Sequence, residues 1–410
     1  MTTSEPLEGA ALDAAVKRNA IVLTAATAFG GSMMPIAVAF GGLAGVYLLG
    51  PDKSLATVPV TALTLGSAVA TIPAAILMAR IGRRAGLVLG AVPGILGGVL
   101  TALAIVAGSF WLFAAASILI GASAAFGQQY RFAAVDAGTE MARSRALGLV
   151  MAGGILAAVI GPQAAILTRD LFSPIPFAGA YASIAVLAVV GALIVSRVRD
   201  LVPPRPRGSS HDRGRPLLVI MRQPRFIAAV LCGMASYAMM SLVMTAAPIA
   251  MVGCGLTQDD AALGIQWHVL AMFAPSYFTG RLIERFGKNA IVIAGLLILC
   301  ACSVVAIAGI TLAHFWIALV LLGIGWNFGF VGATAMLTET YRPEERGRVQ
   351  GLNDFLIFAM SALASFFAGV LIGGPGWIAV NSIVFPTVAL ALAALALASL
   401  ARGTIARPSP

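Results

Sequence analysis

The sequence predicts an all-α membrane protein in which twelve transmembrane helices form two six-helix repeats. Three observations support this prediction. The composition is 60% hydrophobic and only 10% charged, with a mean hydropathy of +0.97. The chain contains twelve long apolar runs, and one loop motif occurs twice, half a chain length apart. Because water cannot solvate so apolar a surface, the expected solvent is a lipid bilayer.

The predicted helices follow the apolar runs, each of which is about 20 residues or longer and can cross about 30 Å of hydrocarbon. The spans are expected at residues 19–49, 57–79, 87–108, 111–135, 146–168, 177–196, 225–253, 261–283, 289–312, 314–338, 352–372 and 378–401. Glu5, Glu8 and Asp13 precede the first basic residues, unlike the start of a cleaved signal peptide. The first span is therefore expected to remain in the protein.

The basic residues predict the orientation of the spans. All of the 26 Lys and Arg residues except Lys53, Arg131 and Arg169 lie in the N-terminal segment, the C-terminal tail or alternate loops. Since positively charged loops stay on the cytoplasmic side, both termini are expected to be cytoplasmic. The formal charge of +10 is spread between apolar runs and is not gathered on one face, so no nucleic-acid partner is expected.

A repeated motif indicates an internal duplication. The end of the span at 261–283 and the loop after it carry Gly280, Glu284, Arg285, Gly287 and Lys288. The loop after the span at 57–79 carries a partial copy, made of Ala75, Ala79, Arg80, Gly82, Arg83 and Arg84. The chain is therefore predicted to comprise an N-terminal six-helix bundle (1–196) and a C-terminal six-helix bundle (226–410).

Residues 197–225 are predicted to be a cytoplasmic linker between the two bundles. They include eight arginines and five prolines, a composition typical of a tether. The apolar stretch Leu217–Met221 within the linker has two interpretations: a short amphipathic turn on the membrane surface, or part of a disordered tether.

With these features, the chain resembles the major facilitator superfamily over essentially its whole length. The resemblance implies two bundles with a substrate path between them, and transport by alternating access. It also implies that the repeated motif latches the cytoplasmic side, with Glu284 near the N-terminal end of the span at 146–168 and Arg285 paired with nearby acceptors. The latch residues implied in this way are Arg80, Gly82, Arg83, Gly280, Glu284, Arg285, Gly287 and Lys288.

The first copy of the motif has Ala79 where the family has an acid. Asp354, at the start of the span at 352–372, is a candidate replacement that would pair with Arg80 or Arg83. The alternative is that Asp354 reflects only the preference of acidic residues for the first turn of a helix.

Polar and aromatic residues at membrane depth mark the expected substrate path, because polar groups are unfavourable in hydrocarbon unless they face a cavity or one another. The candidate substrate-binding residues are Gln128, Arg131, Tyr237, Trp267, His268, Trp326 and Asn327. Three of them have alternatives: Arg131 can extend to the headgroups, His268 can serve as a helix contact, and Trp326 can pack between helices.

No Asp or Glu lies in the middle third of any predicted span. Because a buried carboxylate is the usual proton carrier inside a membrane, proton coupling would have to use His268, Asp136 or Asp354. Without such coupling, the transport would be facilitated diffusion.

The candidate residues are mainly aromatic and amide-bearing, which favours a flat solute with several hydrogen-bonding edges. The segments beginning at Gln128, His268 and Trp326 resemble a branch of bacterial facilitators that includes riboflavin transport. This resemblance implies a monomeric secondary transporter of the bacterial inner membrane that takes up riboflavin or a similar vitamin.

Two other functions remain open: a proton-coupled exporter of drugs or metabolites, and a membrane sensor that does not transport. The sequence has no catalytic, metal-binding or phosphate-binding motif, so neither an enzyme nor a bound cofactor is expected.

Overall fold

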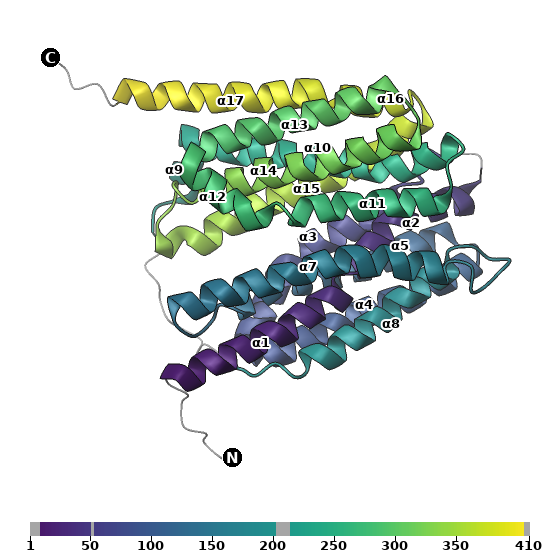
Figure 1. The fold of residues 1–410 in the computed structure, drawn as a ribbon, viewed down its shortest axis with the longest axis horizontal. Coiled ribbons are helices and arrows are strands. Elements are labelled where there is room, and N and C mark those ends of the chain that lie inside the picture. Colours follow the sequence, from purple (N-terminus) through teal and green to yellow (C-terminus); the bar gives the residue numbers. More distant parts are fainter. Residues whose placement is uncertain (1–8, 51–52, 202–213, 406–410) are drawn as a thin grey trace. The chain divides into compact units, whose positions relative to one another are not determined.

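A computed structural model describes residues 9–50, 53–201 and 214–405. Within these ranges the chain is helical and contains no β-strand (Figure 1). Eleven helical segments of the described chain are long and apolar enough to cross a membrane. The predicted all-α membrane fold is confirmed.

The observed helices follow the predicted spans. Those of the first half are α1 (Gly9–Gly30), α2 (Met33–Leu49), α3 (Val58–Ile81), α4 (Arg83–Val106), α5 (Phe110–Gly127), α6 (Tyr130–Ala133), α7 (Glu140–Thr168) and α8 (Ala178–Val195). The later ones are α9 (Leu217–Met221), α10 (Pro224–Gly253), α11 (Gln258–Phe273), α12 (Ser276–Phe286), α13 (Lys288–Ala308), α14 (Leu312–Leu337), the 3-10 turn η1 (Pro343–Glu345), α15 (Arg346–Gly373), α16 (Trp377–Ser382) and α17 (Val384–Ile405). Both α7 and α15 begin several residues before the predicted spans. Their first turns carry charged residues, and the prediction, which followed apolar runs, left these turns out.

The predicted span at 261–283 is not one continuous helix. Helix α11 ends at Phe273 and α12 begins at Ser276, so the span is divided at Ala274 and Pro275. Proline has no backbone N–H and therefore interrupts the helical hydrogen-bond series. Eleven of the twelve predicted spans are thus long apolar helical segments of the described chain, and the broken pair α11 and α12 occupies the position of the remaining one.

The chain divides into two compact units by its backbone contacts. Unit 1 comprises Met1–Ala37 and Val69–Arg207, and unit 2 comprises Val38–Ala68 and Gly208–Pro410. Residues 38–68 thus group with the second half of the chain. In unit 2, the Thr57 hydroxyl donates to the Phe366 carbonyl at 3.3 Å. A Cβ at Gly42 would lie 2.8 Å from the side chain of Ile249, so α2 runs close to α10 there.

In unit 1, α1 packs on α7 and α8, and α4 packs on α5 and α8. Small residues bring these helices together: a Cβ at Gly98 of α4 would lie 2.5 Å from the backbone nitrogen of Ala185 in α8. Close backbone approach of this kind is how helices associate in lipid, where apolar burial gives little net driving force.

In unit 2, α13 packs on α14, and α10 packs on α14, α15 and α17. The crossing of α13 and α14 depends on Gly295, where a Cβ would lie 2.2 Å from the backbone nitrogen of Gly329. The seam between α10 and α15 carries two hydroxyl pairs, Ser241 with Ser361 and Thr245 with Ser365. Small residues and interhelical hydrogen bonds therefore hold this unit together.

The described ends of the linker are fixed by specific contacts. The Asn19 amide donates to the Arg199 carbonyl at 2.8 Å, and the Arg199 N–H donates to Asn19 Oδ1 at 3.0 Å. The centre of the predicted tether, residues 202–213, lies outside the described residues. The stretch Leu217–Met221 forms the short helix α9 and is therefore ordered, whereas its place on the membrane surface stays a prediction.

At the other end of the linker, Arg215 binds Glu345 in η1. Its Nε and Nη2 donate to Oε1 and Oε2 at 2.9 and 2.7 Å, and its backbone N–H donates to Oε1 at 2.8 Å. Glu345, whose side chain also accepts from the Arg342 N–H, is only 1% exposed. The side-chain hydrogen bond from Arg215 is the main reason that the pKa of Glu345 is held well below its usual range.

We expect the stabilising contribution of Glu345 to depend on pH. Its pKa is lower in the folded protein than its ordinary value of 4.5, so the contribution is complete above that value and is lost as the pH falls below it. The difference in melting temperature between wild type and Glu345→Gln, measured in detergent, should be constant near neutral pH and should shrink in acid. A difference that grows in acid would contradict this assignment.

We expect Gly295→Ala to destabilise the protein by about 1–3 kcal/mol, because the added methyl group would collide with the backbone of α14. The matched control is Gly351→Ala in α15, where a Cβ has nothing within 4 Å and should gain stability through helix propensity. Thermal unfolding of both variants in the same detergent measures the difference. Equal melting temperatures would show that α13 and α14 are not in close contact.

Candidate functional site

Four aromatic rings from three helices of unit 2 form a cluster. Tyr237 of α10 lies edge-on to Trp326 and Phe330 of α14, with ring centroids 5.5 and 5.3 Å away, and edge-on to Phe358 of α15 at 5.6 Å. Trp326 and Phe330 are stacked, with centroids 5.1 Å apart and an interplanar angle of 18°. The predicted candidates Tyr237 and Trp326 are thus brought together. We call these four residues the aromatic cluster.

The cluster is not fully buried, and one of its hydrogen-bond donors has no partner among the described residues. Trp326 is 8% exposed, while Tyr237, Phe330 and Phe358 are half-buried and present part of their rings at the surface of the unit. Among the described residues, the Trp326 indole Nε1 has no hydrogen-bond partner. Buried indole N–H groups ordinarily find an acceptor, so this donor is open to a polar group that reaches it.

Asn327, the residue after Trp326, is held by three side-chain hydrogen bonds, and its predicted contact with the solute stays a prediction. Its amide nitrogen donates to the Met272 carbonyl and to the Ser276 hydroxyl, each at 2.7 Å, and its Oδ1 accepts from the Thr279 hydroxyl at 2.6 Å. These partners lie on both sides of the break at Pro275. Asn327 therefore bridges the interruption between α11 and α12.

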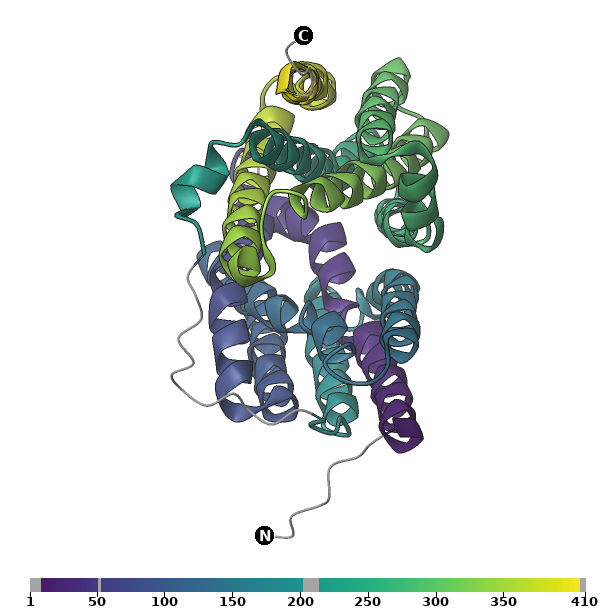
Figure 2. The same cartoon turned by 90° about the vertical axis from the view of Figure 1, so that its left-hand side faces the viewer.

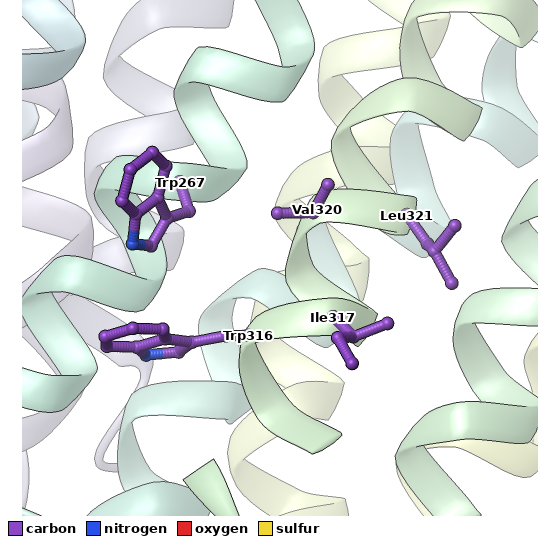
Figure 3. A pocket seen from close by; sticks show the side chains of 5 residues that line it. All are labelled: Trp267, Trp316, Ile317, Val320 and Leu321. Atoms are coloured by element: carbon purple, nitrogen blue, oxygen red, sulfur yellow. The ribbon is translucent and has the colours of Figure 1, made fainter. Parts of the chain in front are cut away.

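Trp267 lies apart from the aromatic cluster, and its predicted contact with the solute stays a prediction. It is 43% exposed and lies with Trp316 at an open groove of about 310 Å³, beside Ile317, Val320 and Leu321 of α14 (Figure 3). All five lining residues are apolar, which suits contact with hydrocarbon and not with a polar vitamin. Trp267 is therefore separate from the aromatic cluster.

His268 points away from that groove and into unit 2. It is fully buried, and its Nδ1 lies 2.9 Å from the Leu319 carbonyl. Because a carbonyl oxygen only accepts, Nδ1 carries the hydrogen and Nε2 is an acceptor, for which the described residues provide no donor. The geometry agrees with the helix-contact alternative for His268.

The polar residues near the end of the predicted span at 111–135 lie at a break between two helices. Helix α5 ends at Gly127, Gln128 and Gln129 form a turn, and α6 begins at Tyr130. Gln128 is half-buried, whereas Arg131 is exposed and places its guanidinium 4.8 Å from the centre of the Phe132 ring. Gln128 and Arg131 therefore do not share the continuous helical face that their spacing predicts.

In the first motif copy, Arg83 begins α4 and binds Asp136. Its Nε and Nη2 donate to the two carboxylate oxygens at 2.6 and 3.1 Å. The preceding Gly82 has φ +91°, and a Cβ there would lie 3.2 Å from the carboxylate of Asp200. Asp200 accepts from the Arg84 N–H at 2.9 Å, so this linker residue caps the N-terminus of α4.

The second motif copy has an equivalent ion pair. Lys288 begins α13 and lies 2.9 Å from Glu339, which also accepts from Arg225 at 2.8 Å. Gly287 has a positive φ of +84°, close to the +91° of Gly82 in the first copy. Gly280, Glu284 and Arg285 are exposed, and Arg80 is exposed in the first copy. Their roles in a latch, and the pairing of Asp354 with Arg80 or Arg83, stay predictions.

Sequence reasoning did not assign Asp200 and Glu339 to these sites. For Glu339 the sequence did contain a signal. Asp136 follows the predicted span at 111–135, and Glu339 follows the corresponding span at 314–338. The separation of these two acids along the chain is almost the same as that of their partners Arg83 and Lys288. For Asp200 there was no such signal, since its partner Arg84 lies 116 residues away.

We expect Asn327→Ala to destabilise the protein by about 1–3 kcal/mol, because the Met272 carbonyl and the Thr279 hydroxyl would lose a buried partner. Thermal unfolding in detergent measures the effect. The control Ser276→Ala removes only one of the three hydrogen bonds and should have a smaller effect. If Asn327→Ala matches wild type, the break at Pro275 is closed by other groups.

The family model described as Major Facilitator Superfamily matches residues 20–275 and 229–410. The riboflavin transporter RfnT of Brucella anthropi is 50% identical to this chain over 378 residues, which are 92% of this chain and 95% of that protein. The uncharacterized MFS-type transporter YdeG of Bacillus subtilis is 29% identical over 387 residues, covering 90% and 88% of the two chains.

A solved structure with a similar fold is that of a bacterial homologue of the human lysosomal transporter Spinster, in an inward-facing and unoccupied conformation. It aligns with a TM-score of 0.68 and 17% identity, over 97% of this chain and 99% of that one. At this identity, the likeness concerns the fold alone.

Proposed function

This chain belongs to the major facilitator superfamily, and on that premise we propose that it takes up riboflavin across the inner membrane of a bacterium. It is a secondary transporter and not an enzyme. The observation that carries the proposed substrate is the 50% identity to a riboflavin transporter over nearly the whole length of both chains.

The chemistry of the aromatic cluster supports this substrate. Riboflavin has a flat tricyclic ring with polar edges, and flat rings pack well against aromatic side chains. Tyr237, Phe330 and Phe358 present half-buried ring surfaces, and the Trp326 N–H offers a donor that no described residue uses. We propose that the cluster binds the ring of riboflavin and that Trp326 donates to one of its acceptors.

The other predicted candidates contribute in different ways. Gln128 and Arg131 stay proposed as polar contacts, since they lie at the break between α5 and α6 and offer amide and guanidinium groups. Asn327 ties α14, the helix that carries Trp326, to the end of α11. His268 supports the contact between α11 and α14. Trp267 is left out of the proposed substrate site.

We further propose uptake without an ion gradient. The spans have no carboxylate in their middle third. Asp136 is paired with Arg83, and His268 is buried against α14, which hinders proton exchange with water. Facilitated diffusion of riboflavin, made effective by its consumption inside the cell, fits these observations. The proposed form is a monomer with both termini in the cytoplasm, as the distribution of basic residues suggests.

The test is growth of a bacterial riboflavin auxotroph that lacks its own transporter, at low external riboflavin. Expression of this chain should restore growth and uptake of labelled riboflavin. Trp326→Ala should reduce uptake by about tenfold, equivalent to about 1.4 kcal/mol. Trp326→Phe should retain part of the uptake, because it keeps one aromatic ring while it loses the N–H donor and the second ring.

Trp267→Phe is the matched control, since it changes a tryptophan of the same unit outside the aromatic cluster, and its uptake should equal that of wild type. Membrane levels of all variants are compared by immunoblot. No rescue by a protein that reaches the membrane would contradict riboflavin uptake. Rescue that is unaffected by Trp326→Ala would contradict the proposed site alone.

A further inference from the structure

We infer that α9 lies in the headgroup layer on the side of the membrane where α10 begins. We infer also that α9 binds an anionic phospholipid surface there. The inference does not depend on the identity of the transported solute. It rests on the orientation of α9, on its exposed apolar residues, on its charge and on its place in the chain.

Specific contacts fix the orientation of α9. Ile220 is 1% exposed and points into unit 2. On the N-terminal side, Arg215 is bound to Glu345 and donates to the Thr340 carbonyl at 3.0 Å. On the C-terminal side, the Gln223 amide donates to the same carbonyl at 3.1 Å. The short helix is therefore held at both ends, and it cannot turn to bury its other side.

The opposite side of α9 is apolar and exposed. Leu218 is 58% exposed and Val219 is 51% exposed. A soluble surface helix would place polar residues at these positions, but α9 contains none: its sequence is LLVIM. Apolar side chains at this exposure are stable where they enter the acyl boundary of a bilayer.

The charges around α9 favour an anionic surface. Arg222, directly after the helix, is exposed. Arg215 and Arg225, on either side of α9, are already paired with Glu345 and Glu339, so among the described residues the cation next to α9 that can meet a headgroup is that of Arg222. Basic residues beside an apolar interfacial segment are attracted by anionic headgroups, and the attraction adds to the apolar contact. This combination distinguishes a phospholipid surface from an uncharged apolar partner.

The position of α9 brings it to the membrane boundary. Only Arg222 and Gln223 separate it from α10, which is itself a membrane-spanning segment. Figure 2 shows the short helix at the edge of unit 2, beside the start of α10. Through Arg215 and Glu345, lipid contact at α9 would also hold η1, the turn that leads into α15.

The experiment places a reporter on the exposed side of α9. Val219→Cys, in a protein whose Cys232, Cys254, Cys300 and Cys302 are replaced by alanine, is labelled with a polarity-sensitive fluorophore. The full-length protein is reconstituted in phosphatidylcholine vesicles with or without phosphatidylglycerol, including lipids that carry a nitroxide near the headgroup. We expect at least twofold stronger quenching by the nitroxide lipid when phosphatidylglycerol is present.

The control site is Glu344→Cys, which is exposed on η1 beside the same linker contact and should show little quenching in either lipid. Leu218→Cys provides a second position on α9 and should behave like Val219→Cys. Arg222→Gln, combined with the Val219 label, should reduce the response to phosphatidylglycerol.

Three results would overturn the inference. One is a label at both α9 positions that stays in water in every lipid mixture. Another is a label that is shielded from water in every lipid mixture and is nevertheless not quenched by the nitroxide lipid, which would mean that another segment of this chain covers α9. The last is a label shielded only after a soluble cell extract is added, which would indicate a protein partner.

Discussion

Hydrocarbon cannot hydrogen-bond to a peptide group, and this constraint governs the structure from its helices to its candidate site. Where a helix is interrupted inside the membrane, a side chain must replace the lost bonds. Asn327 does so at Pro275 with both amide hydrogens and its oxygen. The broken helix is thereby fixed to α14 next to Trp326, so the packing of the aromatic cluster and the repair of the backbone depend on adjacent residues.

The two repeats have kept a common electrostatic arrangement with different side chains. Arg83 meets Asp136 through two hydrogen bonds, whereas Lys288 meets Glu339 as a single cation, and Arg225 supplies a second. A planar guanidinium can bind both carboxylate oxygens, but an ammonium group acts as a point charge. The second repeat therefore needs two basic residues for an acid that one arginine satisfies in the first.

Composition and apolar runs were sufficient to predict the helical membrane fold, because both reflect the solvent of the protein. Local rotation of the helices was not predictable in this way. Trp267 and His268 are neighbours in sequence, but one faces outward and the other is buried against α14. A polar residue at membrane depth signals a need for a partner without identifying it, which is why Asn327 could be placed at depth but not assigned to the backbone of α11. Asp200 lacked even that signal.

The cap that Asp200 gives to α4 shows where the first unit ends. A truncated protein that ended with α8 would keep every membrane span of that unit. It would still lose the Asp200 carboxylate beside Gly82 and the Arg199 carbonyl that binds Asn19. Separately expressed fragments intended to reassemble should therefore be divided between residues 201 and 214, so that Asp200 stays with α4 and Arg215 stays with Glu345.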